Sequence, residues 1–381
     1  MNEKAQTLQS WLSEIYRSLH QIPELGRELP ETLAFVDARL DELKVPHRRC
    51  AGGILAQLQA GAGKPVVALR ADLDALPLDE ETGLPWASRH AGKMHACGHD
   101  AHVTCALGAL KLLREEKELA ASLRVLFQPD EEGDGGAAPM IADGALEGVS
   151  AALGLHVSSD YPVGTLAALP GRTRASSDMF TVVLRGRGCH GASPHMGVDT
   201  VAGGAQIIGA LQTLVSRETD PLDSVVLTVG HFEAGRARNV IPDRARFDGI
   251  IRTLTPRSRE RSRARFKEIV SGLSSALRMS AEITVIPSYP PVINDRGETA
   301  FFLRAAASVA GEKGIAVPEF PKMGVDDFAY LAEKVPGCYA ELGCRGENQP
   351  QEPLHSPRFC PDEGCLPVGA AAIAAWVQSP R

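Results

Sequence analysis

The sequence lacks an apolar run that is long enough to cross a bilayer. Its longest run, 368–377, is rich in alanine and far shorter than the ~20 residues that a spanning helix needs. Residues 2–10 are polar and lack the apolar core of a secretory signal peptide. We therefore expect a cytoplasmic protein with no membrane partner.

Positive charge is also in short supply. The 40 Lys and Arg residues are outnumbered by 47 Asp and Glu residues, which gives a net charge of -7. This balance argues against nucleic acid as a partner, because proteins that bind nucleic acid present an excess of basic residues to the phosphates. The basic segment 257–265 follows a helical pattern and includes Glu260, so we interpret it as a solvated helix face.

Cysteine is sparse, with eight residues in a chain of 381. Because we expect no secretory leader, we predict reduced thiols rather than a disulfide framework. Cys344, Cys360 and Cys365 lie near one another in the sequence, but their spacing matches no standard zinc motif. We interpret them as buried or incidental thiols.

The chain is long enough for two domains. Short apolar runs alternate with helical patterns in the first part; the runs are 65–70, 123–128 and 151–156. This alternation predicts an α/β domain with a mixed, largely parallel sheet flanked by helices. The same pattern resumes near residue 290, so we assign 1–177 and 290–381 to one domain.

Residues 178–289 follow a different pattern. Their expected elements come in the order strand–helix–strand–strand–helix–strand. This is the order of a ferredoxin-like α+β fold. We therefore predict that 178–289 form a discrete domain inserted into the α/β domain.

Metal-binding side chains are concentrated in the segment 95–102, which reads His-Ala-Cys-Gly-His-Asp-Ala-His. Thiolate and imidazole are preferred ligands of zinc-like ions. Cys97 and His99 stand where a loop turns into a helix, so both can point at one ion. His95 and His102 are weaker candidates, and we expect one of them to orient a ligand instead.

Further candidate ligands follow the predicted strands. Asp72 and Asp74 follow the first strand, Asp130, Glu131 and Glu132 follow the second, and His156 ends the third. In open α/β sheets, ligands bind outside the carboxyl ends of the strands. We therefore expect these side chains to gather at the edge that also holds the segment 95–102.

The adjacent residues Glu131 and Glu132 can face in different directions. One can bind a metal ion while the other acts as a general base, which is the division of labour that metal-assisted hydrolysis requires. The candidate ligands are more than one tetrahedral ion needs and enough for two ions that share a ligand. They are Cys97, His99, Glu132, His156 and, from a proline-flanked loop, His355.

Ordered motifs along nearly the whole chain carry a family resemblance. They are LHQIPE at 19–24, LRADLDALP at 69–77, HACGHDAH at 95–102, QPDEEG at 128–133, GCHGASPH at 188–195, NVIP at 239–242, GIIRT at 249–253 and LHSP at 354–357. In these motifs the chain resembles the dinuclear-metal aminoacylase/carboxypeptidase superfamily. The most similar branch of these M20 peptidases contains hippurate hydrolase, N-acyl-amino-acid deacylases and auxin-conjugate hydrolases.

The resemblance implies that the α/β domain is catalytic and carries two divalent metal ions. Zinc and manganese are the expected metals, and cobalt or nickel also suit such a site. Cys97 would bridge the ions, and Glu131 would be the general base. The remaining ligands would be His99, Glu132, His156 and His355.

The resemblance also implies that the inserted domain is a lid through which the protein forms a homodimer or a higher homo-oligomer. His190 would reach the active site of the partner subunit and stabilise the oxyanion. Asn239 and Arg252 would bind the substrate carboxylate. Without the resemblance, we would interpret His190 as a histidine in a loop at a strand end and Arg252 as a charged residue on the surface of a strand.

Two positions depart from the pattern of the relatives. Asp130 stands where a small residue is common and adds negative charge beside Glu131. Asp326 stands where glutamate is common. Neither change removes a candidate ligand, but both affect the expected substrate preference.

The expected activity is hydrolysis of the amide bond of N-acyl amino acids, for example N-acetyl or N-benzoyl compounds. A metallo-dipeptidase or carboxypeptidase would use the same ligands and is the alternative. A non-enzymatic metal-binding protein would be expected to lack the base or a ligand, yet all are present. A hydrolase with Cys97 as nucleophile and His99 as its base would differ in surviving chelation.

Overall fold

The computed structural model describes residues 1–347 and 351–381, and these residues form two compact units. The first unit contains Met1–Thr173, Ile293–Phe320 and Asp327–Arg381; the second contains Arg174–Val292 and Pro321–Asp326. The first unit is therefore assembled from segments that lie on both sides of the second in the sequence.

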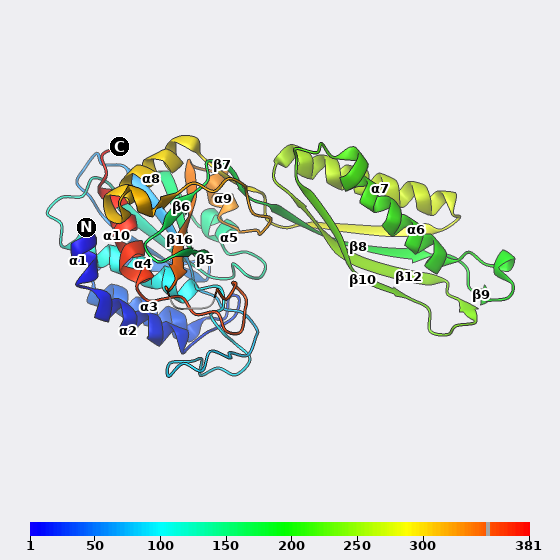
Figure 1. The fold of residues 1–381 in the computed structure, drawn as a ribbon, viewed down its shortest axis with the longest axis horizontal. Helices are drawn as coiled ribbons and strands as arrows, with labels where there is room; N and C mark the ends of the chain where they lie inside the picture. Colours follow the sequence, from blue (N-terminus) through cyan, green and yellow to red (C-terminus); the bar gives the residue numbers. More distant parts are fainter. Residues whose placement is uncertain (348–350) are drawn as a thin grey trace. The chain divides into compact units, whose positions relative to one another are not determined.

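A mixed eight-stranded sheet forms the centre of the first unit (Figure 1). In spatial order its strands are β1 (His47–Cys50), β2 (Gly53–Leu58), β4 (Ser122–Gln128), β3 (Val66–Asp72), β5 (Val149–Pro162), β16 (Gly337–Arg345), β6 (Leu166–Ala168) and β15 (Ile315–Ala316). The four central strands β4, β3, β5 and β16 run parallel. This arrangement confirms the predicted α/β class with a largely parallel sheet.

Helices flank this sheet. They are α1 (Asn2–Gln6), α2 (Gln9–His20), α3 (Pro30–Glu42), α4 (His99–Arg114), α5 (Ala137–Ala142), α8 (Arg296–Ala310), α9 (Ala329–Ala332) and α10 (Cys365–Gln378). Helix α4 packs on β3 and β5, and α8 packs on β16 and β6. The apolar faces of helices and strands share one core, as expected for layers that bury one side each.

The apolar run 368–377 lies in α10, which packs against α4. Small residues allow the two helices to come close. A Cβ atom added at Gly108 would lie 2.8 Å from the Cβ of Ala370, and one added at Gly369 would lie 2.5 Å from the Sγ of Cys105. Within the two described ranges, no helix combines the length and the apolar content that a membrane crossing requires.

The second unit contains a four-stranded sheet in the spatial order β10-β12-β8-β13. Along the chain its elements are β8 (Ser176–Arg185), α6 (Thr200–Thr213), β10 (Val225–Ala234), β12 (Arg244–Thr253), α7 (Pro256–Ala276) and β13 (Ser280–Pro287). All neighbouring strands are antiparallel, and α6 and α7 lie side by side on one face of the sheet (Figure 1). This element order is that of a ferredoxin-like fold.

Side-chain caps begin both helices of the second unit. Asp199 accepts hydrogen bonds from the backbone of Val201 and Ala202 at the start of α6, and Thr255 accepts one from Ser258 at the start of α7. A short π-helical segment, Leu214–Glu218, follows α6. Two short strands, β7 (Gly171–Arg174) and β14 (Val292–Asn294), lie where the chain passes between the units.

The basic segment 257–265 is only partly the solvated face that we expected. Arg259 reaches from α7 to the fully buried Asp178, and its Nε atom lies 2.9 Å from the carboxylate. The interpretation as a solvated face is therefore wrong for Arg259. The spacing of charged residues along a helix does not reveal that an acidic residue is buried on a strand far away in the sequence. All eight cysteines are free thiols, as expected, and Cys344 and Cys365 are buried.

Candidate metal centre

Two groups of potential metal ligands share Cys97. The ligand atoms of Cys97, His99 and His156 lie within 4.8 Å of one another, and so do those of Cys97, Glu132 and His355. The Sγ of Cys97 lies 3.5 Å from the Nε2 of His156, and the Nε2 of His355 lies 3.1 Å from a carboxylate oxygen of Glu132. All five candidate ligands thus converge, with the thiol common to both groups.

The elements that carry these ligands explain their convergence. His156 lies on β5 and Glu132 follows β4, so both come from the carboxyl half of the central sheet. Cys97 and His99 flank Gly98, which has φ +85°. A Cβ atom at Gly98 would lie 2.4 Å from the side chain of Val157, so only glycine fits this turn.

His355 comes from a loop late in the sequence. Its backbone N–H donates to the carbonyl of Ala96 at 2.8 Å, which fixes this loop beside Cys97. His355 has φ +66°, a conformation that non-glycine residues rarely adopt. Such strain is commonly stored at functional sites, where surrounding contacts hold it.

The imidazole of His156 is oriented for metal binding. Its Nδ1 lies 2.7 Å from the carbonyl oxygen of Val157, so Nδ1–H donates and the Nε2 lone pair faces Cys97. Burial and the neighbouring His102 hold the pKa of His156 well below its ordinary value, which keeps the ring neutral. A neutral imidazole is the form that binds a metal ion.

His99 is fully buried, yet within the described residues neither ring nitrogen has a hydrogen-bond partner. Its Nδ1 lies 3.4 Å from Asp74, and its Nε2 lies 3.5 Å from Asp72 and 4.0 Å from Glu131. Buried polar groups are almost always satisfied by protein, water or an ion. The geometry therefore fits a cation seated among these side chains.

The charge states of Cys97 and Glu132 fit the same reading. Burial raises the pKa of the Cys97 thiol well above its ordinary value, against a smaller opposing effect of His99. A bound cation would be needed to hold it as a thiolate. Although burial opposes ionisation of Glu132, His355 and His99 keep the pKa of its carboxyl below the ordinary value.

The contacts of His102 fit the orienting role that we expected for one of the two weaker histidines. Its Nε2 accepts the backbone N–H of Val157 at 2.9 Å, so its Nδ1–H donates to Asp72 at 2.5 Å. Both ring nitrogens are therefore engaged. His95 is buried as well, and burial lowers its pKa to about 4.

Asp74 positions the two adjacent glutamates. Its two carboxylate oxygens accept the backbone N–H groups of Glu131 and Glu132, each at 3.0 Å. The residue is buried, and these contacts fix the turn that follows β4. Sequence analysis grouped Asp74 with strand-end carboxylates but did not reveal this function, because backbone contacts leave no pattern in side-chain spacing.

Asp327 anchors the other end of the same loop. Its carboxylate accepts hydrogen bonds from the backbone of Gly136 and Ala137 at 3.0 and 2.9 Å, and from Arg70 at 2.8 Å. Gln128 donates to it as well. Sequence reasoning missed this residue, which lies almost two hundred positions from the loop that it holds.

The negative charge of Asp130 is paired. Arg27 donates to its carboxylate at 2.8 Å and to the carbonyl of Gly135 at 3.0 Å. Arg27 therefore offsets the negative charge that Asp130 places beside Glu131. Sequence analysis gave no signal of this pairing, because Arg27 lies far away in the sequence.

Two residues expected to bind substrate lie together in the second unit. His190 on β9 (Cys189–His190) pairs with Val240 on β11 (Val240–Ile241), and the N–H of Gly191 donates to the carbonyl of Asn239 at 2.8 Å. The Nδ1 of His190 accepts the N–H of Ala192 at 3.0 Å. The Nε2 of this exposed ring therefore carries the proton of the neutral form and can donate it.

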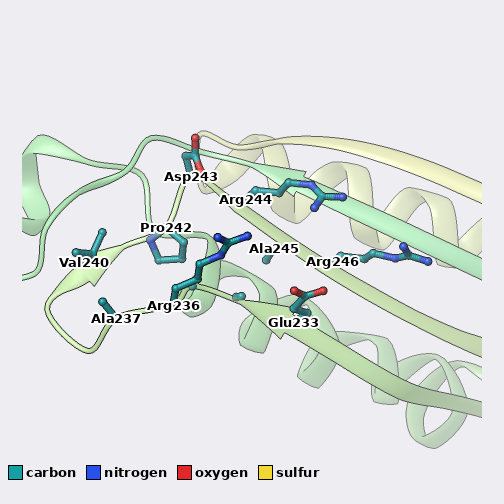
Figure 2. A pocket seen from close by; sticks show the side chains of 11 residues that line it. Glu233, Arg236, Ala237, Val240, Pro242, Asp243, Arg244, Ala245 and Arg246 are labelled. Carbon is teal, nitrogen blue, oxygen red and sulfur yellow. The ribbon is translucent and has the colours of Figure 1, made fainter.

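A cavity of about 530 Å³ lies beside β11, between the end of β10 and the start of β12. Figure 2 shows Arg236 extending between Pro242 and Ala245, with Glu233 near the end of β10. Arg252 lies on β12 as well, eight positions beyond the first residue of that strand.

Comparisons with known proteins identify the family of this chain. Residues 68–379 match the family model described as peptidase family M20/M25/M40. The chain is 41% identical to an N-acetyl-L-cysteine deacetylase of Bacillus subtilis, over 94% of this chain and 86% of that protein. It is 38% identical to an IAA-amino acid hydrolase of Arabidopsis thaliana, over 96% of this chain and 85% of that protein.

A solved structure is similar along the whole chain. It is a Bacillus subtilis protein described as a dinuclear metal-binding peptidase of the M20 family, with 33% identity and a TM-score of 0.84. The alignment covers 98% of each chain. This chain therefore belongs to the M20/M25/M40 peptidase family.

Proposed function

We propose that the protein is a metal-dependent amidohydrolase that cleaves N-acyl amino acids into a carboxylic acid and a free amino acid. The observation that carries this proposal is the pair of ligand groups that share Cys97, with Glu131 beside them. The named activities of the two similar relatives, a deacetylase and an amino acid conjugate hydrolase, support the same reaction class.

The ligand set fits two divalent ions. Cys97 would be shared, with His99, Glu132, His156 and His355 completing the two sites. Thiolate, imidazole and carboxylate together suit zinc or manganese, and also cobalt or nickel. When bound, such ions would lower the pKa of water and polarise the acyl carbonyl.

Glu131 would act as the general base. It would take a proton from the attacking water and return that proton to the leaving amine. Its backbone is fixed through Asp74, which leaves the carboxylate close to His99. A base must be held within reach of the reacting atoms, and this loop supplies that constraint.

His190, Asn239 and Arg252 would act on the substrate. The Nε2–H of His190 would donate to the oxyanion, a contribution worth roughly 3–4 kcal/mol for a well-placed donor. Asn239 and Arg252 would bind the carboxylate of the amino acid, a charge-assisted contact that favours free acids over amides. We propose on the same grounds that the second unit acts as a lid and as the contact surface of a homodimer or higher oligomer, and that the protein is cytoplasmic.

A substrate panel tests the proposal. Release of free amino acid would be measured from N-acetyl, N-benzoyl and aminobenzoyl-glutamate compounds and from dipeptides, before and after chelation. Chelator-sensitive release from the acyl amino acids is the expected result. Release mainly from dipeptides would assign a peptidase instead, and activity that survives thorough chelation would overturn the metal-dependent mechanism and favour Cys97 as a nucleophile.

A further inference from the structure

The guanidinium of Arg252 lacks an acidic partner among the described residues. Its Nη1 atom is buried and has no hydrogen-bond partner there. Burial alone lowers its pKa from the ordinary value, with no acid nearby to offset this effect. A buried donor of this kind is costly unless a ligand satisfies it.

Other arginines of the same unit are paired. Arg246 contacts Asp248 at 2.8 Å, Arg185 contacts Glu282 at 2.8 Å, and Arg265 contacts Glu218 at 2.7 Å. Asp178 lies close to Arg252 in the sheet, but its side chain is buried toward α7, where it pairs with Arg259. Arg252 differs from these three arginines in having no acidic partner among the described residues and a buried Nη1 that lacks a hydrogen-bond partner.

The strand pairing shows which side chains surround Arg252. Val226 on β10 lies directly opposite it, and two positions along the same face Ile250 lies opposite Met179 on β8. Directly opposite residues in antiparallel strands project to the same face. Arg252 is thus bordered by these three apolar side chains and by Ser177, which lies directly opposite it on β8.

This face of the sheet is the one that α6 and α7 leave uncovered within the second unit. The alternate residues Phe180 and Ile251 are buried in the core beneath the helices. Met179 is 46% exposed and Val226 is 37% exposed, so both add apolar area to this open face. The surface therefore combines one cation that lacks a partner with adjoining apolar area.

We infer that this surface selects the amino acid half of the substrate, with Arg252 binding its carboxylate and Met179, Val226 and Ile250 contacting an apolar side chain. The inference rests on the proposed function, because it assumes that an N-acyl amino acid is the substrate. A guanidinium that binds the α-carboxylate through two N–H groups has no second such pair of N–H groups for an acidic side chain. A charged side chain would lose water against apolar neighbours without gaining a partner.

The test compares kcat/KM for N-acetylleucine, N-acetylmethionine, N-acetylglycine, N-acetylglutamate and N-acetyllysine. The apolar substrates are expected to exceed the charged ones by about tenfold or more, since a few methylene contacts supply that discrimination. In Met179→Ser the ratio of N-acetylleucine over N-acetylglycine should fall about tenfold. In Arg252→Met, KM should rise for every substrate of the series.

Ile286→Ser is the matched control. Ile286 is 52% exposed and lies opposite Met179 on β13, two strands away from Arg252, so the same loss of apolar area occurs outside the inferred contact. Its leucine-to-glycine ratio should equal that of the unmodified protein. Hydrolysis that favours charged side chains, or equal ratios in Met179→Ser and Ile286→Ser, would overturn the inference while leaving the amidohydrolase assignment intact. Failure to hydrolyse any of these substrates would instead count against the proposed function.

Discussion

His20 and Asp100 form a buried pair in which the Nδ1 of the imidazole lies 2.6 Å from a carboxylate oxygen. The pair joins the end of α2 to the first turn of α4, directly after the candidate ligand His99. Glu80 lies 3.3 Å from the other ring nitrogen. The motifs at 19–24 and 95–102 are therefore connected by one ionic cluster.

This cluster predicts a loss of stability at alkaline pH. Burial opposes the charged imidazole, but Asp100 and Glu80 outweigh it and raise the pKa of His20 from 6.5 to about 10. Because the folded-state pKa is raised, the stabilisation is complete below pH 6.5 and declines until the pH passes about 10, by at most about 1.4 kcal/mol per unit. Unfolding in urea between pH 6.5 and 10 should show a flatter decline for His20→Gln; equal slopes would contradict the prediction.

Removal of metal should lower both activity and thermal stability. Ions that bind only the folded protein stabilise it by about 2.7 kcal/mol at a concentration of 100 times Kd. We expect EDTA to abolish amide hydrolysis and to lower Tm by several degrees, because the buried side chain of His99 then has no ion to satisfy it. Calorimetry before and after addition of zinc or manganese measures this, and an unchanged Tm would argue against occupied sites.

The two adjacent glutamates should respond differently to the same substitution. Glu131→Gln removes the base and should lower kcat by about 10²–10⁴, with metal content unchanged. Glu132→Gln removes a candidate ligand and should lower the number of bound ions. Elemental analysis alongside kinetics separates the two outcomes, and metal loss in Glu131→Gln alone would show that the roles are exchanged.

Asp74→Asn tests the turn that holds these glutamates. An amide presents one oxygen acceptor and one NH₂ group, so one of the two N–H groups at 3.0 Å loses its partner. We expect a loss of about 1–3 kcal/mol in unfolding free energy, together with lower kcat. Asp79→Asn is the control, because Asp79 accepts a backbone N–H from Gly92 at an exposed turn; equal effects of both variants would contradict a special function for Asp74.

The fold and the M20 family were predictable because their signals are local or ordered along the chain. Buried strands such as β3 and β4 are continuous apolar runs in the sequence. The helices and strands of the second unit, from β8 to β13, follow one another in the order of a ferredoxin-like fold. Strand β1 gave no such signal, since it contains His47, Arg48 and Arg49. It exists because it pairs with β2.

The candidate ligands were predictable from residue chemistry and from their position at strand ends. Their supporting contacts were not. Asp327, Arg27 and Asp74 act on backbone groups or on charges far away in sequence. Which buried N–H a carboxylate accepts depends on the folded path of the chain, and one sequence does not encode that path in any spacing.

The interrupted layout of the first unit also sets an order of events during synthesis. Residues 174–292 leave the ribosome before His355 and before α10, which packs against α4. Because domains fold as units during translation, the second unit can acquire its structure while the α/β sheet still lacks β16. The nascent protein therefore has no complete set of candidate metal ligands until the segment that contains His355 has emerged. We expect metal binding by these residues to be a late step in its biogenesis.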